Sequence, residues 1–110
     1  MADEYQVFIL SRANRDVDHI YTWLLKRSPA GAGKWYSAFL QAASSLSQDP
    51  ERCAMSLESE RLGAPIRNHF FKTPSGRIYR IVFLVVGNEV RILRVRGPGQ
   101  PPLKSIDQLE

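Results

Sequence analysis

The residues of this sequence best suited to chemistry are basic side chains in its last third, most of them arginines. Residues 61–96 carry eight basic side chains against one acidic residue, Glu89, whereas residues 1–60 carry six basic and eight acidic ones. The eight are Arg61, Arg67, Lys72, Arg77, Arg80, Arg91, Arg94 and Arg96. Because a guanidinium group binds phosphate and carboxylate through paired hydrogen bonds, this distribution indicates an anionic partner. The alternative is that strand arginines only solvate an exposed sheet face.

Groups that could transfer a proton are scarce in the same region. Arginine stays protonated at neutral pH, so His69 and Tyr79 are the candidates, and Lys72 is a poorer one. Neighbouring strand residues point to opposite faces, so we expect Tyr79 to point away from Arg80. His69 is interpreted as a structural histidine before a catalytic one. The one cysteine, Cys53, has neither a disulfide partner nor metal-ligand spacing, which predicts a small buried side chain and neither a metal nor a cofactor.

The first half of the sequence predicts a strand and two helices that could support these groups. Residues 5–10 alternate as a strand does, and helical spacing begins after Ser11, the expected N-cap. A second helix is expected from Ser28-Pro29 to about Ser47, since proline is favoured at the first helical position. The apolar stripes include Ala13, Val17, Ile20, Tyr21, Trp23 and Leu24 on the first helix, and Trp35 and Phe39 on the second. We assign Trp23, Trp35 and Phe39 to the core. Helices joined by so short a connection form an antiparallel hairpin.

The second half predicts the sheet that this hairpin covers. Strands are expected over residues 66–71, 78–86 and 90–96, with a turn at 73–76 and a hairpin turn at Gly87-Asn88. The connector before them is irregular apart from one short helical turn. Its acidic residues, Glu58 and Glu60, are interpreted as side chains whose pairing with arginine contributes little when exposed.

The hairpin turn fixes a register from which the faces can be predicted. Pairing Val86 with Glu89 places Arg80 opposite Val95, on the face away from Arg94 and Arg96. A bulge near Arg94 would change this assignment.

The fold class that follows is α+β in the order β-α-α-β-β-β, with residues 1–110 as a single domain. Residues 97–110 form a tail rich in proline and glycine, which we expect to leave the domain as an extended segment. The first residues lack the basic start of a signal peptide, and their apolar run is too short to span a bilayer. We therefore expect a cytoplasmic protein without a membrane partner.

This order of elements resembles the RelE/ParE toxin superfamily. The resemblance is carried by Tyr79-Arg80-Ile81 opening the central strand and by residues 92–96, Ile-Leu-Arg-Val-Arg, closing the sheet. It implies the toxin half of a type II toxin-antitoxin pair, neutralised by an antitoxin segment that wraps it, as a homodimer or as a hetero-oligomer with the antitoxin. One branch of the superfamily is a metal-independent ribonuclease that cuts messenger RNA on the ribosome, and the other poisons DNA gyrase by binding it.

The residues favour the binding branch. Arg80 matches the arginine that the ribonucleases use on the central strand, and Arg67 lies where they often have a basic residue. Beyond the last strand, however, the chain has residues 97–102, Gly-Pro-Gly-Gln-Pro-Pro, where those enzymes have a basic residue and a tyrosine. We therefore predict a ParE-like toxin that binds its target, with a ribonuclease using His69 and Arg80 as the alternative and a degenerate, non-toxic partner-binding module as a third reading. The side chains expected to bind target or antitoxin are Arg67, Lys72, Arg77, Arg80, Arg91, Arg94 and Arg96, of which Arg67, Arg80, Arg94 and Arg96 are expected to carry most of the interaction.

Overall fold

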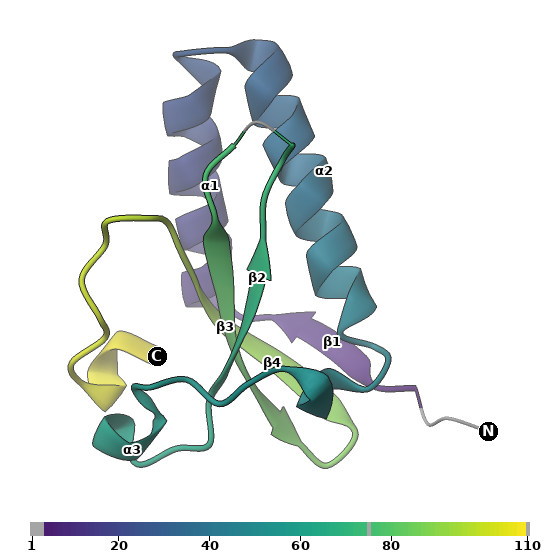
Figure 1. Ribbon diagram of the computed structural model, residues 1–110, viewed down its shortest axis with the longest axis vertical. Helices are drawn as coiled ribbons and strands as arrows, with labels where there is room; N and C mark the ends of the chain where they lie inside the picture. Colours follow the sequence, from purple (N-terminus) through teal and green to yellow (C-terminus); the bar gives the residue numbers. More distant parts are fainter. Residues whose placement is uncertain (1–3, 75, 110) are drawn as a thin grey trace.

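The computed structural model describes residues 4–74 and 76–109 and confirms the predicted β-α-α-β-β-β order, with the expected short helical turn of the connector present as a separate helix (Figure 1). The elements are β1 (Gln6–Ile9), α1 (Ser11–Leu25), α2 (Pro29–Ser45), α3 (Ser59–Leu62), β2 (Arg67–Phe71), β3 (Tyr79–Val86) and β4 (Glu89–Arg96), with 3-10 turns at Pro50–Arg52 and Ile106–Leu109. The predicted turn at 73–76 includes Ser75, which lies outside the described residues. In the part of the chain described, no helix is both long and apolar enough to cross a membrane.

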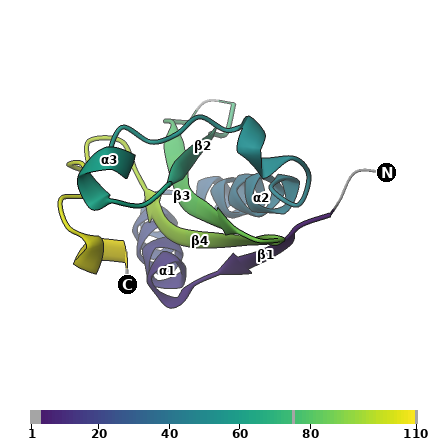
Figure 2. The same ribbon diagram turned by 90° about the horizontal axis from the view of Figure 1, so that it is seen from below.

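The strands form one mixed sheet in the order β1-β4-β3-β2. β1 runs parallel to β4, and the other two pairings are antiparallel. The helical hairpin of α1 and α2 covers one face of the sheet, while α3 and the C-terminal segment lie against the other (Figures 1 and 2). The sheet therefore has two apolar faces, and β3 and β4 contribute buried side chains to both.

The helical hairpin forms largely as its sequence predicts. The Ser28 hydroxyl accepts a hydrogen bond from the Gly31 amide at 3.0 Å and caps α2, with Pro29 as the first helical residue. The predicted cap of α1 is wrong, because the N-cap is Leu10 and no side chain caps this end. The Leu10 amide is still hydrogen-bonded to Ile92 of β4, so the chain leaves the sheet and enters the helix without a turn between them.

One aromatic residue of the hairpin departs from its predicted place. Trp35 and Phe39 are buried in the core under the helices, as expected, but Trp23 is 53% exposed. It lies near the end of α1, beside the buried stripe instead of within it. Its ring packs against the Arg27 guanidinium, whose carbon lies 4.0 Å from the ring centroid.

A bulge in β4 changes the predicted faces of the sheet. Val86 pairs with Glu89 as predicted, but the register shifts beside Val82 and Phe83, so Arg80 lies opposite Arg96 instead of Val95. The shift lets Ile92 and Val95 both reach the core under the helices, while Leu93 reaches the opposite core. Arg80 and Arg96 therefore share a face, contrary to the prediction.

The C-terminal segment does not leave the domain. It turns back across the sheet face that the helical hairpin leaves uncovered, and its side chains Leu103 (0% exposed) and Leu109 (6% exposed) are buried there. Their neighbours in this second core are Leu62, Ile66, Val82 and Leu93. The prediction of an extended tail was wrong because proline and glycine end the strand but do not prevent the leucines beyond them from covering an apolar face.

Candidate functional site: a buried ionic network on the sheet

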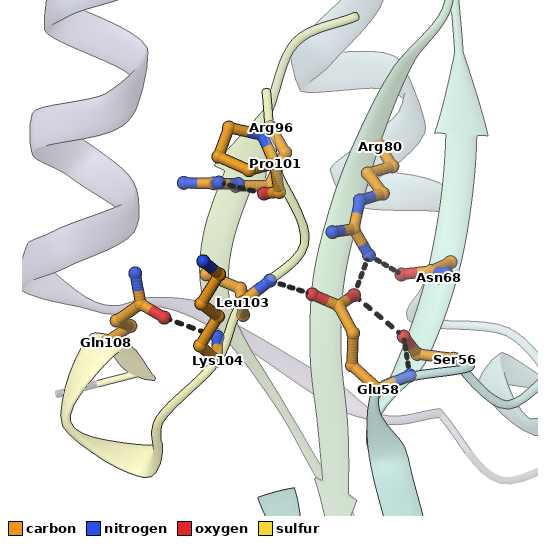
Figure 3. Close-up of polar contacts among 9 residues, drawn as sticks. All are labelled: Ser56, Glu58, Asn68, Arg80, Arg96, Pro101, Leu103, Lys104 and Gln108. Atoms are coloured by element: carbon orange, nitrogen blue, oxygen red, sulfur yellow. Dashed lines mark hydrogen bonds and ion pairs between the residues drawn. The ribbon is translucent and has the colours of Figure 1, made fainter. Parts of the chain in front are cut away.

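Arg80, the basic residue at the start of β3, is held by two side chains of the same chain. Its Nη1 lies 2.5 Å from Oε1 of Glu58 and 3.0 Å from Oδ1 of Asn68, as Figure 3 shows. The side chains of Arg80 and Glu58 are 18% and 7% exposed. The guanidinium is thus largely neutralised before any partner arrives.

Glu58 connects three segments of the chain. Its carboxylate accepts hydrogen bonds from Arg80, from the Ser56 hydroxyl at 3.1 Å and from the main-chain amide of Leu103 (Figure 3). Burial alone would raise the pKa of Glu58, but the hydrogen bonds from Arg80, Leu103 and Ser56 and the charge of Arg80 outweigh it, so the pKa lies below its ordinary value. Glu58 thus pairs with an arginine, as the sequence suggested, but it is buried, so the small contribution expected of an exposed pair does not apply to it; Glu60 is exposed. Sequence offered no signal for this, since Leu103 is distant along the chain.

Arg94 and Arg96 join β4 to α1 and to the C-terminal segment. The guanidinium of Arg94 binds Asp16 of α1 through two hydrogen bonds of 2.7 and 3.0 Å and also donates to the Gln108 carbonyl at 2.7 Å. Arg96 donates to the Pro101 carbonyl at 2.6 Å (Figure 3) and is 7% exposed. Burial, followed by the neighbouring charge of Arg94, lowers the pKa of Arg96. Both guanidinium groups are therefore engaged in contacts within the fold.

The other predicted binding residues are spread over the molecule. Arg67 donates to the carbonyls of Glu51 and Cys53, at 3.2 and 2.6 Å, and so fixes the connector to β2. Arg91 forms a partly exposed ion pair with its strand neighbour Glu89 at 3.1 Å. Lys72 and Arg77 are exposed in the connection between β2 and β3. The structure does not bring the seven basic side chains together on one surface.

His69 lies on the opposite face of the sheet from Arg80. It pairs across the strands with Ile81, whose side chain is buried under the helices, whereas Arg80 pairs with Phe70. Its Nε2 lies 3.2 Å from the Ser45 hydroxyl, which donates its own hydrogen to the Ala42 carbonyl, so Nε2 is the donor. Nδ1 then accepts from the Cys53 thiol, at 3.7 Å.

This environment is typical of a structural histidine. Burial, followed by the nearby Arg52 charge, lowers the pKa of His69, so the ring stays neutral. Cys53 is buried, as predicted, and burial raises the pKa of its thiol.

Tyr79 points away from Arg80, as predicted. Its ring packs against Trp35 and Phe71 under the helices, at centroid distances of 5.4 and 5.8 Å. Burial raises the pKa of Tyr79. Within residues 4–74 and 76–109, no proton-transfer group with a pKa near neutrality contacts Arg80, and no group of three metal-ligating side chains gathers anywhere.

Comparison with known proteins places the chain in a family. Residues 7–100 match the sequence model of the ParE toxin of the type II toxin-antitoxin system, parDE. The chain belongs to the ParE toxin family. It is the toxin component of a type II toxin-antitoxin system, which confirms the resemblance to the RelE/ParE superfamily.

A solved structure supports the fold of this ParE-family toxin. It is similar to a chain of the chromosomal ParDE toxin-antitoxin system from P. aeruginosa, with a TM-score of 0.68 and 22% sequence identity, over 87% of this chain and 98% of that chain. Among curated proteins, none matches the sequence significantly. The family match ends at residue 100, so the buried Leu103 and Leu109 lie beyond it.

Proposed function

We propose that this ParE-family toxin acts by binding a protein target, with DNA gyrase as the target class, and that a cognate antitoxin neutralises it. The observation that carries the proposal is the state of Arg80. The residue that would face a scissile phosphate in a ribonuclease is paired with the buried carboxylate of Glu58 at 2.5 Å.

RNA cleavage makes demands that this arrangement does not meet. Attack by the 2′-hydroxyl needs a base, an acid for the departing oxygen and uncompensated positive charge beside the phosphorane. Here Glu58 compensates the charge of Arg80, so the pair offers no net positive charge to a phosphate. The candidate proton-transfer groups, His69 and Tyr79, belong to the side of the sheet under the helices.

Partner binding needs none of these catalytic groups. The family to which the chain belongs is defined by toxins of the type II toxin-antitoxin system, and the similar P. aeruginosa chain comes from a ParDE pair. That membership supports a cognate antitoxin, and a protein target is part of the proposal. The exposed charge of Lys72 is available to an acidic surface of such a partner. The main role of four arginines would then be to hold the sheet against α1, the connector before β2 and the C-terminal segment. They are Arg67, Arg80, Arg94 and Arg96.

Two assays run in parallel test the proposal. Purified toxin is added to a gyrase supercoiling reaction and to translating ribosomes whose message is followed by primer extension. We expect supercoiling to be inhibited and the message to remain intact. Site-specific message cleavage that disappears in both Arg80→Ala and His69→Ala, but persists in the partly exposed control Arg91→Ala, would establish the ribonuclease alternative. No effect in either assay, together with normal growth when the toxin is expressed without an antitoxin, would establish a degenerate partner-binding module.

A further inference from the structure

A groove of about 1130 Å³ lies where the tip of the helical hairpin approaches the β2–β3 connection. Its walls come from the second half of α1, the start of α2, the connection before β3 together with the first residue of that strand, and the segment 97–100 that follows β4. These segments meet in the upper part of Figure 1. Gly97 lets that segment pass close to the aromatic wall, since an added Cβ would lie 3.1 Å from the ring of Tyr79. The groove is on the helix-covered side of the sheet, away from Arg80.

The charges that line this groove have one sign. Lys26, Arg27 and Arg77 contribute three full positive charges, and none of the lining residues is an aspartate or a glutamate. Like charges gathered around a concave, partly apolar wall concentrate a positive potential there. The groove is therefore complementary to an anionic occupant.

The apolar part of the groove includes three large aromatic side chains. Trp23 is 53% exposed within it, and Arg27 covers one face of the indole. Trp35 and Tyr79 form the deeper wall, where Nε1 of Trp35 is buried without a hydrogen-bond partner among the described residues. Tryptophan, tyrosine and arginine are the side chains most enriched at the energetic centres of protein interfaces.

The arrangement of the rings favours a peptide over a nucleic acid. Proteins that bind single strands stack successive bases on several aromatic faces. Here the ring of Trp35 packs edge-on against that of Tyr79 at 5.4 Å, and both rings pack into the core. Of the tryptophan and tyrosine rings that line the groove, only that of Trp23 is more than half exposed. A single exposed indole beside three cations suits one apolar side chain flanked by carboxylates.

We propose that this groove binds an acidic segment of a partner protein, with an apolar side chain against Trp23 and flanking carboxylates on Arg27, Lys26 and Arg77. The inference goes beyond the proposed function, because the groove does not contain Arg80 or its network and does not depend on which target the toxin poisons. It identifies the occupant by chemistry alone.

Binding of labelled peptides to the intact toxin tests this inference. The probe is a fluorescein-labelled Glu-Glu-Leu-Glu-Glu peptide, compared with Gln-Gln-Leu-Gln-Gln and with oligothymidylate by fluorescence anisotropy in low-salt buffer. We expect the acidic peptide to bind at least about tenfold more tightly than its glutamine counterpart, and to weaken as salt rises. Arg27→Glu and Arg77→Glu should each reduce its affinity by about tenfold, since each replaces an attraction by a repulsion.

Matched variants separate the groove from general charge effects. Lys34→Glu makes the same charge change at an exposed site on α2 outside the groove and should alter the affinity by less than about twofold. Trp23→Ala, on a half-exposed residue, should weaken binding while circular dichroism shows an unchanged fold. Loss of binding in Lys34→Glu equal to that in Arg27→Glu, absence of peptide binding, or tighter binding of oligothymidylate would each overturn the inference.

Discussion

Glu58 lies 2.5 Å from Arg80 and ties the connector before β2 to the central strand of the sheet. The second oxygen of the same carboxylate accepts the Leu103 amide, so the pair also holds the C-terminal segment. Removing one member of a buried ion pair leaves the other uncompensated, which costs far more than the pair itself contributes. The stability of the sheet face covered by α3 and the C-terminal segment therefore depends on this carboxylate.

Glu58→Gln tests that dependence. The amide keeps the shape of the side chain but removes the charge, so we expect the free energy of unfolding to fall by about 2–4 kcal/mol. Urea denaturation followed by circular dichroism measures it. Glu60→Gln, at an exposed position two residues away, should change stability by less than about 0.5 kcal/mol. Equal effects of the two substitutions would show that the pair does not stabilise the fold.

Acid should weaken the same network. The pKa of Glu58 is lowered in the folded protein, so between that value and the ordinary 4.5 the unfolded chain binds more protons. The contribution of Glu58 is therefore fully present above about pH 4.5 and is lost as the pH falls through the folded pKa. Urea midpoints measured over this range should fall less steeply in Glu58→Gln than in the unaltered protein. Parallel curves would show that Glu58 does not titrate in this way.

Leu103 should matter for stability although it follows the proline-rich segment. It is fully buried against Ile66, Val82 and Leu93, and its removal leaves a cavity in the second core. Leu103→Ala is expected to cost about 2–4 kcal/mol in the free energy of unfolding. Leu57→Ala, where the side chain is fully exposed, is the control and should be nearly neutral. A near-neutral result for Leu103→Ala would mean that the segment does not cover the sheet in solution.

Sequence predicts the elements of this fold better than the contacts between them. Local signals, such as the Ser28-Pro29 cap and the Gly87-Asn88 turn, specify where helices and hairpins begin, because the interactions that favour them lie within a few residues. Alternation alone does not predict the bulge in β4, because the bulge depends on packing in two cores. It allows Ile92 and Val95 to be buried on one face of the sheet and Leu93 on the other.

The same limit explains what was missed in the candidate site. The concentration of arginines was visible, and it suggested binding to an external anion. Their partners, among them Glu58 and Asp16, come from distant parts of the chain, and an ion pair between distant residues leaves no local pattern. The assignment of Trp23 to the core was wrong for a similar reason. Helical spacing predicts which residues of α1 form an apolar stripe, but it does not predict how far along α1 the sheet extends to cover that stripe.

Asp16 should hold α1 to β4 through more than its charge. Its carboxylate accepts two hydrogen bonds from Arg94 and one from the Val95 amide at 2.9 Å. Asp16→Asn keeps the size but turns one acceptor into a donor that faces Arg94, so we expect a loss of about 2–4 kcal/mol. Thermal and urea unfolding measure this loss. Asp18→Asn, exposed on the same helix, should remain within about 0.5 kcal/mol of the unaltered protein.

His69 should make stability depend on pH closer to neutrality. Its pKa is lowered in the folded state by burial and by Arg52, so below the ordinary value of 6.5 the unfolded chain takes up a proton that the folded chain resists. Stability from the neutral ring is therefore present above pH 6.5 and declines as the pH falls towards the folded pKa. In His69→Phe this decline should disappear, although the variant loses the hydrogen bonds to Ser45 and Cys53 at every pH. Unfolding midpoints at a series of pH values measure the difference. An NMR titration of the ring that gave a pKa at or above 6.5 would contradict a buried, neutral His69. The argument against catalysis relies on that neutral ring.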